Sequence, residues 1–451
     1  MDNLGNGRVQ FLLRQISSLL IYQSVLSTEV GNAFIELLQS IHFTNVDARG
    51  CLEAYGKYFQ FLANQNKNWE EYLITRILAD DNPFSKLAQH STFAELPPAL
   101  IAAVQHDLQI LQNLYECSSA VLSEWVQTAA HLPISPIVWY TEYNDIGNSE
   151  TSLLINHLQE LANWGDAVED LANYYQNFGT GVFTAYSALR WHEGKFIGIN
   201  YPDRVSLKQL VGYESQRDIL VKNTEFLLSG HVALHILLYG SRGSGKSSLV
   251  KALLNHYTNQ KLRLLEVSKS ELQDLPEIME KLHLLPHKFI VFVDDLSFEE
   301  DDDAFKALKV VLEGSITARP QNVVVYATSN RRHLIREFFG DRPKLKDKDE
   351  IQAWDTMQEK LSFSDRFGLT LTFEPADQDK YLHIVQHLAK QAKINMEPEE
   401  LIANALQWAT RHNGRSGRTA RQFIDFLTAS LATQPKFAFA EKFDELKSNY
   451  N

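Results

Sequence analysis

The segment from Gly240 to Ser247, which reads Gly-Ser-Arg-Gly-Ser-Gly-Lys-Ser, constrains the fold of this chain more than any other feature. It matches the pattern GxxxxGK[ST], follows an apolar run at residues 236–239, and precedes a helical pattern that begins at Ser248. Glycines allow such a loop to wrap around phosphate groups, so that backbone N–H groups and the N-terminus of a helix point at the anion. The segment therefore predicts a strand, a phosphate-binding loop (P-loop) and a helix in succession.

Two side chains of this loop have specific expected roles. Lys246 is expected to reach the β- and γ-phosphates of a nucleotide, and Ser247 to coordinate Mg²⁺. The expected cofactors are therefore ATP and Mg²⁺. The loop residues predicted to bind them are Gly240, Ser241, Arg242, Gly243, Ser244, Gly245, Lys246, Ser247 and Ser248.

Two carboxylates follow the apolar run at residues 289–293, where an acidic element is needed to hold the metal opposite the loop serine. We predict that the first of them, Asp294, is the metal partner. Asp295 is expected to position the attacking water, a role for which ATPases of this kind usually have a Glu. A carboxylate one methylene shorter can act there through a small shift. Together with the loop, these acids predict a Mg²⁺-dependent P-loop ATPase.

The predicted fold changes character along the chain. From Val9 to about Leu189 apolar residues recur at helical spacing, whereas beyond about residue 205 apolar and β-branched runs alternate with helical patterns. From about Asp377 the pattern is helical again. We predict an all-α N-terminal region, an α/β P-loop domain with a five-stranded parallel sheet, and a small all-α lid. The expected strands are 235–239, 262–267, 289–293, 323–328 and 369–373.

Turn-forming residues place the first domain boundary between about 175 and 205, at the turn signal 177–181 and at Gly194, Gly198 and Pro202. The predicted domains are a helical N-terminal domain (1–190), a nucleotide-binding domain (191–376), and a helical lid with the C-terminal tail (377–451).

By their order, these motifs resemble those of the AAA+ ATPase superfamily, over roughly residues 205–432. Val211 and Gly212 lie in a segment similar to the one that passes beside the adenine in that family. Asn330 stands where the family has its polar sensor-1 residue, and Arg366 lies in a segment resembling the arginine finger. The resemblance implies that Asp295, Asn330 and Arg366 are the catalytic residues and that the protein works as a homo-oligomer.

Two arginines near the end of the resemblance are candidates for the sensor-2 position. Arg418 and Arg421 both lie in the helical region after Gly417, and the family's variable spacing leaves the choice open. The whole-chain pattern, with residues 177–181 before the ATPase core and 415–423 near its end, is similar to a bacterial group of predicted AAA+ proteins of uncharacterised role. That similarity implies no substrate.

The acidity of the chain is concentrated in its N-terminal part. The net charge is −13, and residues 1–200 contain 9 Lys and Arg against 21 Asp and Glu. Because such a segment is repelled by phosphate backbones, protein recognition is favoured over nucleic-acid binding. The N-terminus lacks a signal-peptide pattern and Cys51 and Cys117 are the only cysteines, so we expect a soluble cytoplasmic protein without disulfides.

These observations predict an ATP-hydrolysing protein that remodels, loads or regulates a macromolecular partner recruited by the N-terminal domain. Two alternatives remain open. One is an ATP-dependent switch or adaptor with negligible turnover, which Asp295 in place of Glu supports. The other is a DNA-acting initiator or helicase-loader type of ATPase. A peptide-threading machine is disfavoured, because residues 268–275 contain no aromatic side chain where such proteins carry an aromatic loop.

Overall fold

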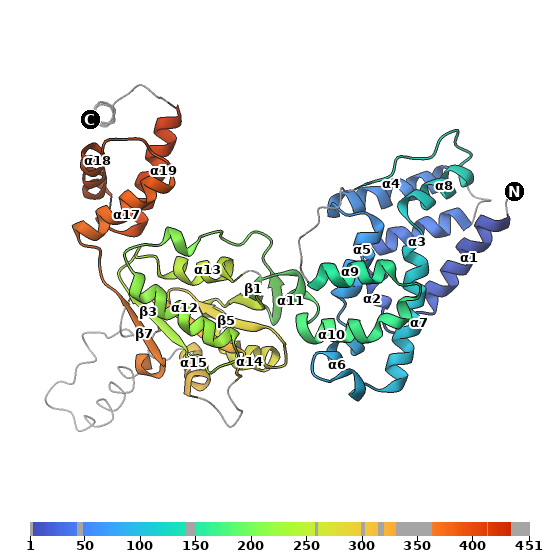
Figure 1. Ribbon diagram of the computed structural model, residues 1–451, viewed down its shortest axis with the longest axis horizontal. Helices are drawn as coiled ribbons and strands as arrows, with labels where there is room; N and C mark the ends of the chain where they lie inside the picture. The colour runs from blue at the N-terminus through green and yellow to red at the C-terminus, as the bar shows by residue number, and fades with distance from the viewer. Residues whose placement is uncertain are drawn as a thin grey trace. The chain divides into compact units, whose positions relative to one another are not determined.

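The computed structural model describes residues 3–42, 48–140, 150–257, 260–298, 303–313, 320–330, 363–412 and 414–433 (Figure 1). The chain divides into two compact units. Unit 1 comprises Met1–Ala185 with Leu284–Pro286, and unit 2 comprises Tyr186–His283 with His287–Asn451. None of the helices within the described ranges combines the length and the apolar character that crossing a bilayer requires.

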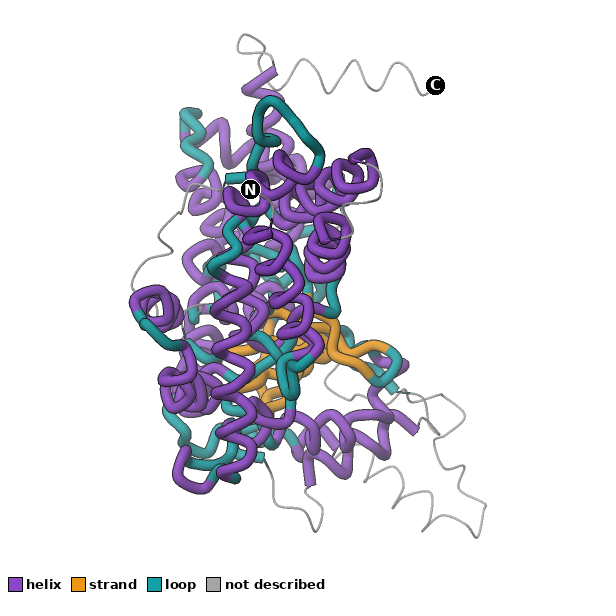
Figure 2. The backbone as a smooth tube through the Cα atoms, turned by 90° about the vertical axis from the view of Figure 1, so that its right-hand side faces the viewer, coloured by secondary structure: helices purple, strands orange, loops and turns teal. Residues whose placement is uncertain are grey.

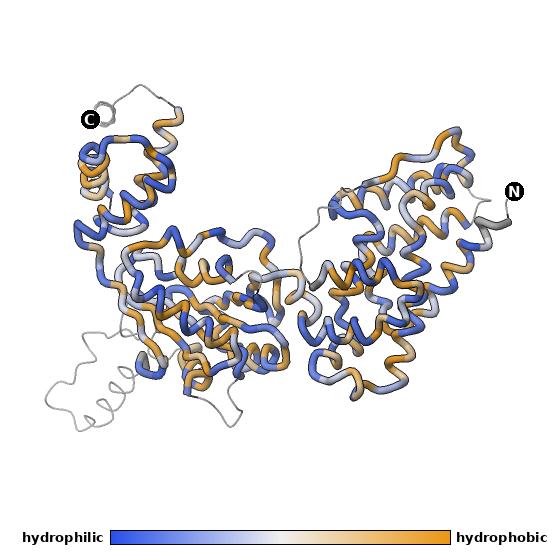
Figure 3. The backbone as a smooth tube through the Cα atoms, in the orientation of Figure 1, coloured by the Kyte–Doolittle hydropathy of each residue, from blue (hydrophilic) through white to orange (hydrophobic). Residues whose placement is uncertain are grey.

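All the regular secondary structure among the described residues of unit 1 is helical, which confirms the predicted all-α N-terminal region. Hydrophilic and hydrophobic residues alternate along its helices (Figure 3). Buried apolar residues from most of these helices form one core cluster, as expected for amphipathic helices. The elements are α1 (Asn3–Ser17), α2 (Gln23–Leu26), α3 (Glu29–His42), α4 (Ala48–Gln65), α5 (Trp69–Leu78), α6 (Pro83–Ala88), η1 (Phe93–Glu95), α7 (Pro98–Tyr115), α8 (Ser119–Ala129), α9 (Glu150–Glu160), η2 (Trp164–Ala167), α10 (Val168–Phe178) and α11 (Val182–Ala185).

Aromatic stacking and one buried carboxylate organise the core of unit 1. The ring of Phe34 stacks on Trp69 with centroids 4.0 Å apart, and the Trp69 indole N–H donates to the Leu114 carbonyl oxygen. Asp107 is fully buried, and its carboxylate accepts hydrogen bonds from the backbone N–H groups of residues 20–22. These hydrogen bonds compensate the cost of burying the charge, so the core tolerates it. Asp107 thereby links α7 to the turn after α1.

Unit 2 contains one seven-stranded sheet (Figure 2). Its strand order is β2-β1-β4-β5-β6-β3-β7, and every neighbouring pair is parallel except β1 and β2. The central strands are buried on both faces, which explains why they read as continuous apolar runs. The strands are β1 (Ala188–His192), β2 (Lys195–Gly198), β3 (Ile236–Gly240), β4 (Leu262–Glu266), β5 (Lys288–Val293), β6 (Val323–Ser329) and β7 (Leu369–Phe373).

The prediction of five strands is wrong, because the sheet also contains the hairpin β1–β2. Its two-residue turn, Glu193 and Gly194, has positive φ at both positions (49° and 78°), as a type I′ turn requires. Gly194 was interpreted as punctuation between domains instead of as a turn within a hairpin. β1 pairs in parallel with β4, so this hairpin extends one edge of the sheet.

Helices cover the sheet, and a cluster of three follows it. Tyr381, Phe423 and Leu427 are fully buried in the apolar cluster formed by α17, α18 and α19. The predicted C-terminal region continues beyond Thr433 into residues 434–451, which lie outside the described residues. The helices of unit 2 are η3 (Leu207–Gln209), α12 (Glu214–Leu228), α13 (Lys246–His256), η4 (Lys269–Asp274), α14 (Leu275–His283), α15 (Asp303–Glu313), η5 (Phe363–Arg366), α17 (Gln378–Gln391), α18 (Pro398–Arg411) and α19 (Gly417–Thr433).

Candidate nucleotide-binding site

The predicted phosphate-binding loop joins β3 to α13, as the sequence pattern requires. Gly240, Gly243 and Gly245 adopt φ of 134°, 76° and 91°, which L-residues with side chains rarely adopt. At Gly240 a Cβ atom would also lie 2.0 Å from the Phe373 carbonyl oxygen of β7. The backbone therefore needs glycine here, and the resulting loop ends at the N-terminus of α13.

Lys246, the first residue of α13, is buried and its ammonium group faces backbone oxygens. Nζ donates to the carbonyl oxygens of Gly240 (3.0 Å) and Ser241 (2.8 Å) and to Oδ1 of Asn330 (3.3 Å). Burial lowers the pKa of Lys246, and the carboxylates of Asp294 and Asp295 oppose that shift. Carbonyl oxygens are weaker acceptors than phosphate oxygens, so these donors can be redirected to a polyphosphate.

A hydroxyl and a carboxylate meet at the position predicted for the metal. The Ser247 Oγ donates to Oδ1 of Asp294 at 2.6 Å, and the Thr328 Oγ1 donates to the same oxygen at 2.5 Å. Asp294 follows β5 and Thr328 lies near the end of β6, and these strands are neighbours in the sheet. The Ser247 hydroxyl and the Asp294 carboxylate are hard oxygen donors of the kind that suits Mg²⁺, which keeps further positions for water and phosphate.

Asp295 and Asn330 form a second pair beside the first. The Asn330 amide donates to Oδ1 of Asp295 at 2.6 Å, and the Asp295 N–H donates to the Thr328 Oγ1 at 2.9 Å. Asp295 has φ of 51°, a left-handed conformation that is uncommon for a residue with a side chain. The strand-end position and this backbone conformation turn the Asp295 carboxylate toward the cavity that Lys246 also lines.

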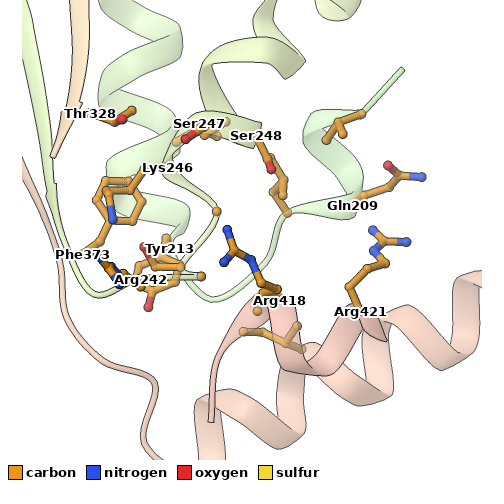
Figure 4. A pocket seen from close by; sticks show the side chains of 18 of the residues that line it. Gln209, Tyr213, Arg242, Lys246, Ser247, Ser248, Thr328, Phe373, Arg418 and Arg421 are labelled. Carbon is orange, nitrogen blue, oxygen red and sulfur yellow. The ribbon is translucent and has the colours of Figure 1, made fainter. Parts of the chain in front are cut away.

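A cavity of about 820 Å³ connects these groups with the C-terminal helices (Figure 4). Most of the predicted site residues line it. They are Val211, Arg242, Gly243, Ser244, Gly245, Lys246, Ser247, Ser248, Asp294, Asp295, Asn330, Arg418 and Arg421. Gly240, Ser241, Gly212 and Arg366 are not among the lining residues, although Ser241 and Gly212 are chain neighbours of residues that are.

Arg366 lies in η5, away from the cavity lining. Its guanidinium group forms an ion pair with Glu313, the last residue of α15.

The two sensor-2 candidates take different positions on α19. The backbone N–H of Arg418 donates to the Gly243 carbonyl oxygen at 3.0 Å, which ties the start of α19 to the P-loop. The guanidinium of Arg418 points toward the P-loop and acts electrostatically on Lys246, whereas the Arg421 side chain points toward Gln209 (Figure 4). The two arginines thus face different parts of one cavity.

The sequence reasoning missed Thr328 and Tyr213. Thr328 anchors the Asp294 carboxylate, and its place two residues before Asn330 was the available signal. Tyr213 follows Gly212 directly; its ring lies 5.0 Å from that of Phe373, and its hydroxyl donates to the Glu374 carbonyl oxygen. Its contribution depends on a neighbour 160 residues away in sequence, which no local pattern reveals.

Comparisons with known proteins identify a family but no activity. A family model described as "Protein of unknown function (DUF815)" matches residues 184–431. No curated protein matches the chain.

The matched solved structures include forms of RuvB from Thermotoga maritima. Two mutants each have a TM-score of 0.36 and 16% identity, with 51% of this chain and 66% or 67% of theirs covered. A structure titled as the RuvB Holliday junction branch migration motor has a TM-score of 0.31 and 14% identity, with 49% and 72% covered. Likenesses at this level carry no argument about what the present chain does.

Proposed function

The chain belongs to DUF815, a family of proteins of unknown function, and we propose that it is a Mg²⁺-dependent ATPase of the AAA+ type. The resemblance indicated by the motif order, to the AAA+ superfamily and to a group of uncharacterised role, is confirmed. The observation that carries the proposed activity is the meeting of Lys246, Ser247 and Asp294 at one end of a cavity large enough for a nucleotide.

In the proposed complex, backbone N–H groups of the P-loop and the Lys246 ammonium bind the polyphosphate. Ser247 and Asp294 hold Mg²⁺, which when bound supplies charge compensation for the β- and γ-phosphates. Thr328 keeps the Asp294 carboxylate oriented through its hydrogen bond. Arg418, which points toward the P-loop, is the proposed sensor 2.

Hydrolysis requires a group that orients and deprotonates water. The Asp295 carboxylate is the proposed base, and the Asn330 amide beside it is the proposed partner of the attacking water or the γ-phosphate. Arg366 is proposed to act on the nucleotide of a neighbouring subunit, because it does not line the cavity of its own.

One observation favours the alternative of a switch with negligible turnover. The Asn330 amide already occupies Oδ1 of Asp295 at 2.6 Å, and a carboxylate in this bond is less able to accept a proton from water. A steady-state phosphate-release assay separates the alternatives: turnover supports the ATPase, and tight MgATP binding without turnover supports the switch. Salt-dependent binding to single- or double-stranded DNA would support a DNA-acting ATPase instead.

Lys246→Ala tests the site itself. We expect this change to weaken MgATP binding by roughly 100-fold or more, because the site loses its principal cation for the β- and γ-phosphates. Isothermal titration calorimetry measures both affinities. Lys251→Ala, on the same helix but outside the cavity lining, is the matched control and should bind like the wild type. Equal affinity of Lys246→Ala and wild type would exclude the proposed site.

A further inference from the structure

The cavity carries more positive charge than the proposed polyphosphate site uses. Six cationic side chains and three carboxylates line it. The cationic side chains are Arg204, Arg217, Arg242, Lys246, Arg418 and Arg421, and the carboxylates are Asp203, Asp294 and Asp295.

Four of the cations already have partners or a proposed role. Arg242, Lys246 and Arg418 belong to the P-loop end, and Arg217 forms an ion pair with Asp218 at 3.0 Å. In contrast, Arg204 and Arg421 form no ion pair with any carboxylate of the described ranges. An arginine without a counter-ion at the wall of a cavity is a ready partner for an anionic ligand.

Arg421 faces the part of the cavity that lies away from Lys246. It follows Arg418 by three residues on α19, so the two side chains share one helix face about 4.5 Å apart along the axis. Figure 4 shows Arg418 directed toward the P-loop and Arg421 directed toward Gln209. Arg421 is half-buried and Gln422 beside it also lines the cavity.

Arg204 is placed at the same cavity by contacts of its own backbone neighbours. The Asn255 amide of α13 donates to the carbonyl oxygens of Asp203 (2.9 Å) and Val205 (2.8 Å), which fixes the segment on both sides of Arg204. These two hydrogen bonds fix the backbone at Arg204, so its Cα position at the cavity wall is set by α13.

We propose that Arg421 and Arg204, with the side-chain amides of Gln209 and Gln422, form a second anion site for a phosphate on the ribose of the bound nucleotide. The inference rests on the proposed nucleotide binding at the P-loop, because a polyphosphate held by Lys246 directs the nucleoside toward this part of the cavity. The ligand class is an adenine nucleotide with a 5′-polyphosphate and an additional ribose phosphate. The carboxylate of Asp203 also lines the cavity. Its negative charge repels such a ligand and so reduces the gain in affinity over ATP.

The test compares ATP with two derivatives that carry one extra phosphate at the ribose 2′ or 3′ position, titrated into the full chain with Mg²⁺. We expect at least one derivative to bind about tenfold more tightly than ATP to the wild type. Arg421→Ala and Arg204→Ala should each reduce the ratio of the two Kd values toward one. Asp203→Asn should increase it. Lys390→Ala, which removes a cation of α17 outside the cavity lining, should leave it unchanged.

Two results would overturn the inference while leaving the proposed function intact: tight ATP binding with no gain from either ribose phosphate, or a gain that survives Arg421→Ala and Arg204→Ala. If neither ATP nor a derivative binds, both the inference and the proposed function fail. Comparing the two derivatives shows whether the site prefers a phosphate at the 2′ or at the 3′ position of the ribose.

Discussion

Asp295 concentrates several constraints in one residue. Its backbone is left-handed, its N–H is held by Thr328, and its carboxylate is held by Asn330. A non-glycine residue in this conformation is maintained by its surroundings, and such residues gather at functional sites. The position next to the proposed metal partner, Asp294, makes Asp295 the residue whose chemistry decides between an ATPase and a switch.

We expect Asp295→Asn to preserve MgATP binding and to lower any hydrolysis by about 100-fold or more, because an amide cannot accept a proton from water. Calorimetry measures the binding, and phosphate release measures the turnover. Asp425→Asn, at an exposed position of α19, is the control and should turn over like the wild type. Unchanged turnover in Asp295→Asn would assign the catalytic base to another residue.

At the scale of elements, a buried tyrosine joins β6 to α12. The Tyr326 hydroxyl accepts a hydrogen bond from the Asn223 amide at 3.0 Å and lies 3.0 Å from the Thr224 hydroxyl. Burial raises the pKa of Tyr326 from 10.0 to about 12, and these two hydrogen bonds partly offset the shift. The neutral phenol therefore stabilises the folded state relative to the phenolate.

The sign of this pH dependence follows from the raised pKa. The stabilisation is fully present below pH 10 and is lost as the pH rises toward 12, because the unfolded chain releases the proton first. We expect Tyr326→Phe to cost about 1 kcal/mol at pH 8 and to reduce the loss of stability between pH 8 and pH 11. Thermal unfolding at both pH values measures the effect.

Tyr201→Phe is the matched control for that comparison, because the side chain of Tyr201 is 91% exposed and its loss should not change the pH dependence. If Tyr326→Phe loses as much stability as the wild type between the two pH values, the β6–α12 contact does not contribute to the alkaline sensitivity.

At the scale of the whole molecule, the position of Arg366 leads us to expect that the protein works as an oligomer. It pairs with Glu313 and does not line the cavity of its own subunit, so a role as arginine finger requires a neighbour. We expect ATPase activity per subunit to rise with protein concentration through the range of assembly. Mixing Arg366→Ala subunits with Lys246→Ala subunits should restore some activity where an intact finger meets an intact P-loop.

The control for the mixture replaces the Lys246→Ala subunit with one that carries both substitutions, which offers no intact finger and should restore nothing. An isolated monomer with full activity would contradict the proposed arrangement.

We propose that unit 1 recruits a protein partner through its acidic residues. The strand pairing of the sheet decides where a fragment that tests this should begin. Because β1 pairs with β4, a fragment starting at Lys195 would lose an integral strand, whereas one starting at Tyr186 keeps it. We expect the 186–451 fragment to bind MgATP and to lose partner association in pull-downs from cell extract. The 1–185 fragment should retain that association with modest salt dependence.

If the 186–451 fragment aggregates and the 1–185 fragment binds nothing, unit 1 serves as a scaffold for the ATPase core. Baiting the pull-down with full-length Asp295→Asn, in which a persistent ATP-bound state is expected, favours capture of the relevant partner.

The sequence by itself determined the elements whose signals are local. Glycine spacing predicted the loop between Gly240 and Lys246, because backbone conformation depends on the residues that occupy it. Continuous apolar runs predicted β3, β5 and β6, because strands buried on both faces contain apolar residues throughout. In β4 and β7 polar residues interrupt the apolar ones, and these strands were predicted from their apolar and β-branched residues. The hairpin β1–β2 was missed although its turn is also local, since Glu-Gly is a weaker signal than Asn-Gly and the strands are short.

Only the tertiary structure decided how distant residues meet. Arg418 and Arg421 are equivalent candidates in the local sequence pattern. The contact of α19 with Gly243 directs Arg418 toward the P-loop and leaves Arg421 pointing toward Gln209. The contact of Thr328 with Asp294 and the ion pair of Arg366 with Glu313 likewise join strands or helices that are far apart in the chain. Such pairings depend on strand order and helix packing, which arise from the balance of contacts in the whole fold, and no window of sequence contains that balance.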